Sequence, residues 1–151
     1  MPEVSPGARA LARRVLLREA GGQPEPAALA EATGRAEARL RGRLADLVGI
    51  TGYTTLVARA VRLAQVEVPA LERVTVDVHI GAGAEGGLRG VREFALANDS
   101  DAAAVEDGLT AILAHVVGLL VIFIGEGLAL RLIHEAWPVL ADDQDNAEGR
   151  A

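Results

Sequence analysis

The stretch that decides the fold is LTAILAHVVGLLVIFIGEGLALRLI, which runs from Leu109 to Ile133. It is apolar on almost every side of a helix, and His115, Glu126 and Arg131 are its only strongly polar interruptions. A helix at a protein surface shows a polar stripe, and this one has none until its last turns. We therefore expect it to be enclosed by other helices, by a second subunit or by lipid.

A buried core helix is favoured over a transmembrane helix. Residues 109–125 carry no formal charge, and 17 residues are at the lower end of what can span a bilayer. Glu126 and Arg131 follow before the apolar run ends, and its flanks lack an aromatic belt or a basic cluster. Three other helices are too few to enclose this one, so we expect a homo-oligomer, most simply a dimer, with Leu119 and Phe123 at the interface. Conditional membrane association stays open as the alternative.

Composition narrows the class of protein. All 15 basic residues of the 151-residue chain are Arg and there is no Cys, which excludes thiol catalysis, disulfides and Cys-ligated zinc. The abundance of Arg, Ala, Gly, Leu and Val is typical of a bacterial genome of high GC content. The first 22 residues lack a signal-peptide pattern, so we expect a cytoplasmic protein. The net charge of −6 argues against nucleic-acid binding, which needs a basic face.

Apolar spacing and helix-ending residues predict four helices. Gly21 and Gly22 end the first, Gly49 ends the second, and Pro69 stops the third. Ser100 is the expected N-cap of the fourth, which contains the decisive stretch. Gly108, Gly118, Gly125 and Gly127 within it are expected to bend this helix or to allow close packing. The predicted ranges are about 6–20, 27–48, 51–68 and 101–136.

A different period appears between the third and fourth helices. In RVTVDVHI, apolar Val74, Val76, Val78 and Ile80 alternate with polar residues, which indicates a half-buried strand. Residues 88–97 fit either a returning strand or a short helix. We therefore predict a β-hairpin or extended arm at about 73–95 that leans on the helical body.

The arm contains one motif with a known chemistry. Gly81, Gly83 and Gly86 form G-x-G-x-x-G after the predicted strand, and VDVHIGAGAEGG resembles the first strand and turn of a Rossmann dinucleotide-binding domain. That resemblance implies pyrophosphate binding at the turn. It covers about a dozen residues, and the parallel sheet that the family needs is not predicted elsewhere. We interpret the motif as a glycine-rich hairpin turn, with nucleotide binding as an alternative function.

The polar residues in the decisive stretch are expected to have structural partners. His115 is interpreted as a core histidine with a hydrogen-bonded partner. A carboxylate among apolar residues is costly unless it is paired, so Glu126 is expected to form an ion pair with Arg59, Arg62 or Arg131. No spacing of ligands predicts a metal site, and no catalytic residue or cofactor is predicted.

A second basic feature lies in the second helix. Arg35, Arg39 and Arg43 recur every four residues and form a basic stripe. Such a stripe is usually a solvated face, although it could also receive the acidic C-terminal segment or an acidic partner.

The sequence thus predicts a mainly α protein, a bundle of about four helices around a long hydrophobic C-terminal helix. One helical domain is expected over residues 1–141, followed by a disordered acidic tail at 142–151. The leading functional hypothesis is a non-enzymatic interaction or regulatory module of a bacterial signalling or assembly system. It would act through self-association and contacts with protein partners.

Overall fold

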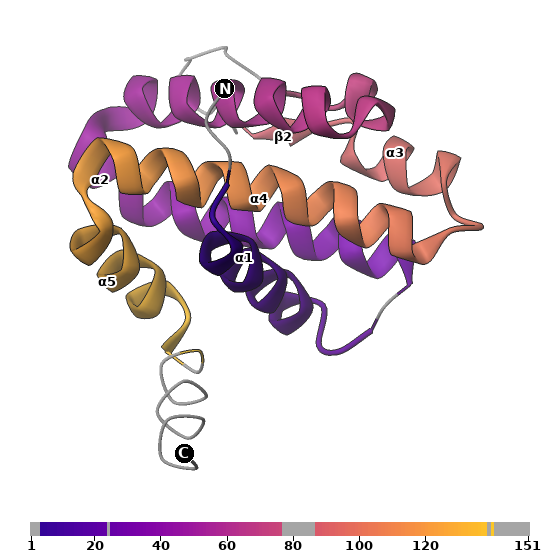
Figure 1. Cartoon of the computed structure of the whole chain (residues 1–151), viewed down its shortest axis with the longest axis horizontal. Coiled ribbons are helices and arrows are strands. Elements are labelled where there is room, and N and C mark those ends of the chain that lie inside the picture. Colours follow the sequence, from indigo (N-terminus) through magenta and orange to yellow (C-terminus); the bar gives the residue numbers. More distant parts are fainter. Residues whose placement is uncertain (1–3, 24, 77–86, 139, 141–151) are drawn as a thin grey trace.

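The computed structural model describes residues 4–23, 25–76, 87–138 and 140 (Figure 1). Within these residues the chain is mainly helical with one small antiparallel pair of strands, which confirms the predicted fold class. The elements are α1 (Pro6–Glu19), α2 (Pro26–Glu67), the 3₁₀-helix η1 (Pro69–Arg73), β1 (Thr75–Val76), β2 (Leu88–Arg89), α3 (Val91–Ala97), α4 (Ala102–Ile124) and α5 (Glu126–Ala136).

Helix α1 begins and ends where local chemistry predicts. The Ser5 side chain accepts a hydrogen bond from the Ala8 amide at 3.1 Å, and Pro6 supplies the first helical residue. Gly21 and Gly22 follow the helix with positive φ angles of 65° and 80°, which end it. Its apolar face is buried against α4, the central helix of the fold (Figure 1).

Helix α2 consists of two halves that reverse direction at Gly49. The backbone there has φ 79° and ψ 157°, a conformation that is essentially restricted to glycine. The two halves run on either side of α4 (Figure 1), and Tyr53 Oη in the second half donates to the Glu37 carbonyl in the first at 3.0 Å. The predicted helix end at Gly49 is confirmed.

Helix α4 is enclosed along the first part of the decisive stretch. All nine residues from Leu109 to Val117 are buried, between α1 on one side and the two halves of α2. The cap is Asp101, whose carboxylate accepts from the Ala104 amide at 3.1 Å, and the expectation that Ser100 caps this helix is wrong. From Gly118 onward, exposed and half-buried positions appear, so the enclosure ends before the helix does.

The expectation of one helix over residues 101–136 is wrong. Helix α4 ends at Ile124, and Gly125 has φ 89° and ψ 153°, nearly the conformation of Gly49. Helix α5 then turns back and buries Ala129, Ile133 and Ala136 against the bundle. The physical reason is that Gly125 tolerates a backbone geometry that stops a helix.

The arm is part strand and part helix. Strands β1 and β2 pair antiparallel, with Thr75 opposite Arg89 and Val76 opposite Leu88. Gly90, at φ 83°, joins β2 to α3. Of the two structures predicted for residues 88–97, the strand forms at residues 88–89 and the helix at residues 91–97. Only two residues of the strand predicted from residue 74 to residue 80 are described as strand, and residues 77–86 lie outside the described part.

The basic stripe of α2 caps the ends of two other helices and is not simply a solvated face. Arg35 Nη2 donates to the Glu19 carbonyl at 2.6 Å at the end of α1. Arg39 Nη1 and Arg43 Nη2 donate to the carbonyls of Ala136 and Glu135 at 3.4 Å at the end of α5. Cations at helix C-termini satisfy free carbonyls and complement the helix dipole.

Candidate functional site

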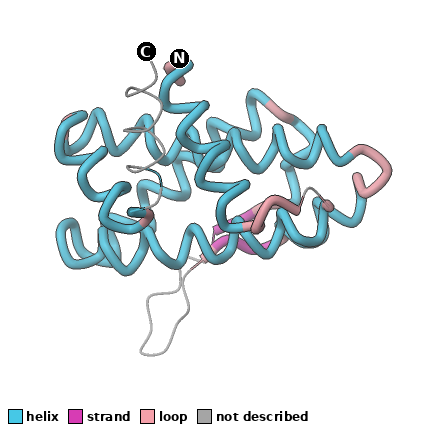
Figure 2. Tube along the Cα trace, turned by 90° about the horizontal axis from the view of Figure 1, so that it is seen from below, coloured by secondary structure: helices cyan, strands magenta, loops and turns pink. Residues whose placement is uncertain are grey.

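The bend within α2, at Gly49, and the turn from α4 to α5, at Gly125, are set by positive-φ glycines. The bend of α2 and the turn between α4 and α5 lie at the same end of the bundle (Figures 1 and 2). Large apolar side chains that remain exposed gather in the residues around these two glycines. We call this set the bend surface, and it consists of Leu47, Ile50, Ile122, Phe123 and Leu128. Phe123 is 68% exposed and Ile122 71%, values that are unusual for side chains of this size.

The bend surface also lacks charge in its two main segments. Residues 47–58 and 109–125 contain no Asp, Glu, Arg or Lys. Exposed apolar side chains that occur singly are ordinary, but these five flank two bends at one end of the bundle, which makes that end a candidate contact site. Of the two residues predicted to lie at a subunit interface, Phe123 is exposed on the bend surface. Leu119 is half-buried and lines a neighbouring cleft.

The expectation that Glu126 lies among apolar residues and pairs with an Arg is wrong. Glu126 is exposed at the start of α5, and in the described part of the chain no ion pair joins it to Arg59, Arg62 or Arg131, which are exposed as well. Because α4 stops at Gly125, Glu126 begins a new helix, where a carboxylate is favoured by the helix dipole and solvated by water.

His115 is a buried core histidine, as its surroundings in the sequence predict, but among the described residues the expected hydrogen-bonded partner is not found at Nε2. Its side chain is 7% exposed, and Nε2 lies 3.4 Å from Oε1 of Glu67, a carboxylate that also accepts from Arg9 Nη2 at 2.7 Å. The contact with Glu67 falls outside hydrogen-bond geometry, so His115 Nε2 has no hydrogen bond. Burial lowers the pKa of His115, although the carboxylate of Glu67 opposes this shift.

A second buried polar group was not predicted from the sequence. Glu37 is 6% exposed within α2, accepts from Tyr53 Oη at 3.3 Å and lies 3.5 Å from Arg41 Nη1. Burial raises the pKa of Glu37, against the opposing effects of Arg41 and Tyr53. Nothing in the spacing separates Glu37 from the exposed acids of the same helix, because its burial depends on the reversal of α2.

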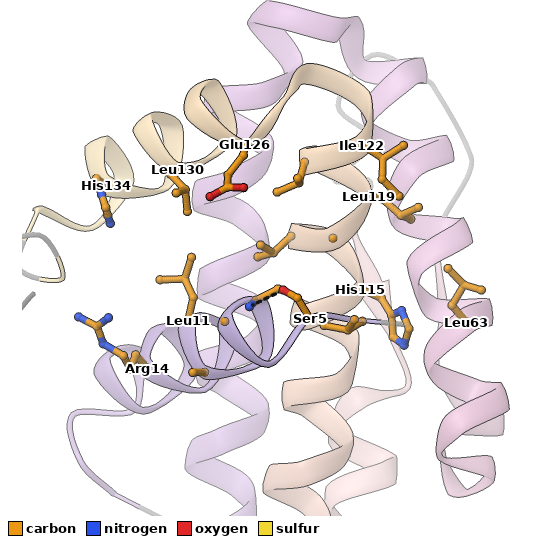
Figure 3. Close-up of a pocket in the computed structure, with 17 residues that line it drawn as sticks. Ser5, Leu11, Arg14, Leu63, His115, Leu119, Ile122, Glu126, Leu130 and His134 are labelled. Carbon is orange, nitrogen blue, oxygen red and sulfur yellow. Dashed lines mark hydrogen bonds between the residues drawn. The ribbon is translucent and has the colours of Figure 1, made fainter. Parts of the chain in front are cut away.

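A cleft of about 460 Å³ lies beside the bend surface, over α4 and between α1 and α5 (Figure 3). Leu11, Leu119, Val121 and Leu130 are among its apolar lining residues. Its polar lining residues are Ser5, Arg14, His115, Glu126 and His134. This size and a mostly apolar lining with few polar groups are typical of small-molecule sites.

The described ranges do not contain a metal centre. Among the residues described, no three His, Asp or Glu side chains lie close enough together to hold a metal ion. The nucleotide candidate Gly81, Gly83 and Gly86 lies outside the described residues, so it stays a prediction. The sheet next to it is antiparallel where it is described, unlike the parallel sheet of the Rossmann family.

Comparison of the chain with protein-family models, curated proteins and solved structures gave no match. Function is therefore inferred from the bend surface and the cleft.

Proposed function

We propose that this chain is a non-enzymatic helical interaction module that self-associates through the bend surface, most simply as a dimer. Its setting in this proposal is a signalling or assembly system in the bacterial cytoplasm. The exposed, uncharged apolar side chains around Gly49 and Gly125 support the proposal. A second copy would remove them from water, which is the main favourable term in most protein association.

The chemistry of the bend surface favours a second copy as the partner. A symmetric dimer places the same patch on both sides, and its apolar side chains can pack against their copies provided that the exposed carboxylates of Asp46 and Glu126 stay in water.

The size of the bend surface predicts a weak dimer. Full burial of a Phe or Ile side chain stabilises by about 1.5–3 kcal/mol, and Phe123 and Ile122 have about two-thirds of that area to bury. A standard interface contains about 20–30 residues on each side, of which these apolar side chains supply only the core. After the entropic cost of association, we expect a Kd in roughly the micromolar range.

Sedimentation velocity over a range of protein concentrations tests this proposal. The wild type is expected to shift from monomer to dimer, and the double variant Leu47→Ser with Phe123→Ser is expected to raise the dimer Kd by at least about tenfold. The matched control is Leu96→Ser, since Leu96 is 58% exposed on α3 near the opposite end (Figure 1). The proposal is overturned if the wild type is monomeric at several hundred micromolar, or if Leu96→Ser weakens the dimer as much as the double variant does.

Membrane association is the second candidate function. Among the described residues, α2 and α4 are long and apolar enough to cross a bilayer, although the most apolar window of α4 is 61% buried within the bundle. Insertion would therefore require the bundle to open and lose that packing. Co-sedimentation with neutral and anionic vesicles separates the two functions. Vesicle binding by a chain that stays monomeric in buffer supports this candidate, and absence of binding removes it.

A further inference from the structure

The cleft between α1 and α5 is distinct from the bend surface in its shape and in the charge at one end. Figure 3 shows Arg14 on α1 and His134 on α5 at the same mouth of the cleft, with Leu11 and Leu130 beside them. Farther along, the lining continues past Val121 to Leu119, which lies on the floor formed by α4. The cleft thus has nitrogen donors at one mouth and a mostly apolar path behind them.

Arg14 is held in place at this mouth. Its Nη2 donates to the carbonyl of Leu140 at 2.9 Å, which holds the guanidinium in place. Among the described residues its other N–H groups have no hydrogen-bond or ion-pair partner, so a ligand can accept from them. A planar guanidinium binds a carboxylate with two parallel hydrogen bonds, and a pre-positioned side chain loses little entropy when it does so. His134 adds a ring nitrogen on the opposite wall of the same mouth (Figure 3).

We propose that the cleft binds a single-chain amphiphilic carboxylate, with its carboxylate at Arg14 and His134 and its alkyl chain along Leu11, Leu130 and the α4 floor. The volume of about 460 Å³ lies within the range of small-molecule sites, about 300–1,000 Å³. Charge complementarity decides the head group, because a cationic head would meet the permanent charge of Arg14. Glu126 lies farther along the α5 wall and is solvent-exposed, so its charge is screened by water.

Gly118 is a position from which the cleft can be blocked. A Cβ added to Gly118, which lines the cleft, meets no atom within 4 Å, so Gly118→Leu can begin a larger apolar side chain there without a clash at Cβ. A Cβ added to Gly42 also meets no atom within 4 Å, and Gly42 is exposed in α2 away from the cleft lining. Gly42→Leu is therefore the matched control. Ile122 belongs to both the cleft and the bend surface and is left unchanged.

Isothermal titration calorimetry with decanoate and dodecanoate, each below its micelle concentration, tests the proposal. Each added methylene is expected to tighten binding by about fourfold if the chain is buried. Gly118→Leu is expected to weaken dodecanoate binding at least tenfold, and Gly42→Leu to leave it unchanged. Binding that is equal in wild type and Gly118→Leu overturns the assignment of the cleft.

The head group is tested separately with dodecanol and dodecyltrimethylammonium. Dodecanoate is expected to bind about tenfold more tightly than either compound, and Arg14→Gln is expected to remove this preference. Glu126→Gln is expected to strengthen dodecanoate binding slightly, since it removes the negative charge on the wall. Tighter binding of the ammonium compound than of dodecanoate overturns the proposal. Thermal unfolding of each variant shows whether its fold is retained.

Discussion

Replacement of Gly125 by alanine tests the bend that divides the apolar stretch. Gly125 has φ 89° and ψ 153°, and a Cβ added there meets no atom within 4 Å. The cost of Gly125→Ala is therefore a backbone cost, of order 1–3 kcal/mol for a residue forced into this region. Alanine also reduces the conformational entropy of the unfolded chain, which stabilises the folded state by about 0.4–1 kcal/mol and offsets part of this cost. We expect a net loss of about 1–2 kcal/mol.

Gly127→Ala is the matched control, two residues further along. Gly127 lies inside α5, is exposed, and has open space within 4 Å of where a Cβ would lie. Alanine is favoured over glycine in a helix by up to about 1 kcal/mol, so this variant is expected to be more stable than the wild type. The two substitutions add the same methyl group, and opposite signs identify backbone conformation as the cause.

Thermal unfolding followed by circular dichroism measures both effects. For a chain of this length, 1 kcal/mol corresponds to about 2–4 °C in Tm, so Gly125→Ala is expected to lower Tm by roughly 2–8 °C. Protein concentration is held equal and low, because self-association would add to the apparent stability. An unchanged or higher Tm for Gly125→Ala refutes the positive-φ conformation of Gly125 at the bend. Small-angle scattering then reports whether α4 and α5 have merged into one longer helix.

Two further predictions concern a buried histidine and a close backbone approach. The lowered pKa of His115, caused first by burial, means that its contribution to stability is present above its ordinary value of 6.5 and is lost as pH falls below it. Glu67, whose pKa is lowered chiefly by the hydrogen bond from Arg9, stays ionised in this window. Between pH 8 and pH 5.5, the free energy of unfolding in urea is expected to fall more for the wild type than for His115→Asn. An equal fall in both proteins would contradict the contribution of His115. Gly90→Ala is expected to be more damaging than Gly125→Ala, because its Cβ would lie 2.1 Å from the Arg73 carbonyl oxygen and its φ is positive. Poor recovery of folded protein or a Tm at least about 5 °C lower is expected from that clash, and a Tm equal to the wild type would contradict it.

Local sequence signals predicted the start of α1 and the places where two helices end. Helix α1 starts at Pro6, where its predicted range began, and Gly49 ends the first half of α2, because helix starts and positive φ depend on the residue and its near neighbours. The same kind of signal was present at Gly125 and Gly127, but the continuing apolar run led to the prediction of one long helix. The local signal was the correct one at this position.

Other expectations failed because they depended on distant parts of the chain. Arg35, Arg39 and Arg43 are regularly spaced in α2, but their partners are the ends of α1 and α5, which sequence spacing does not bring together. The burial of Glu37 likewise requires the second half of α2 to return over the first. The arm was predicted only in outline, because a short strand has no stable register without the helices beneath it.

The apolar stretch from Leu109 to Ile133 shows where the two kinds of information divide. By itself the sequence indicated that this stretch is helical and enclosed, since an uncharged apolar run cannot face water on every side. Only the tertiary structure decided that enclosure stops near Gly118, because the helices packed on α4 do not cover its end. Coverage depends on where neighbouring helices cross and turn, and it leaves Ile122 and Phe123 exposed and Glu126 in water.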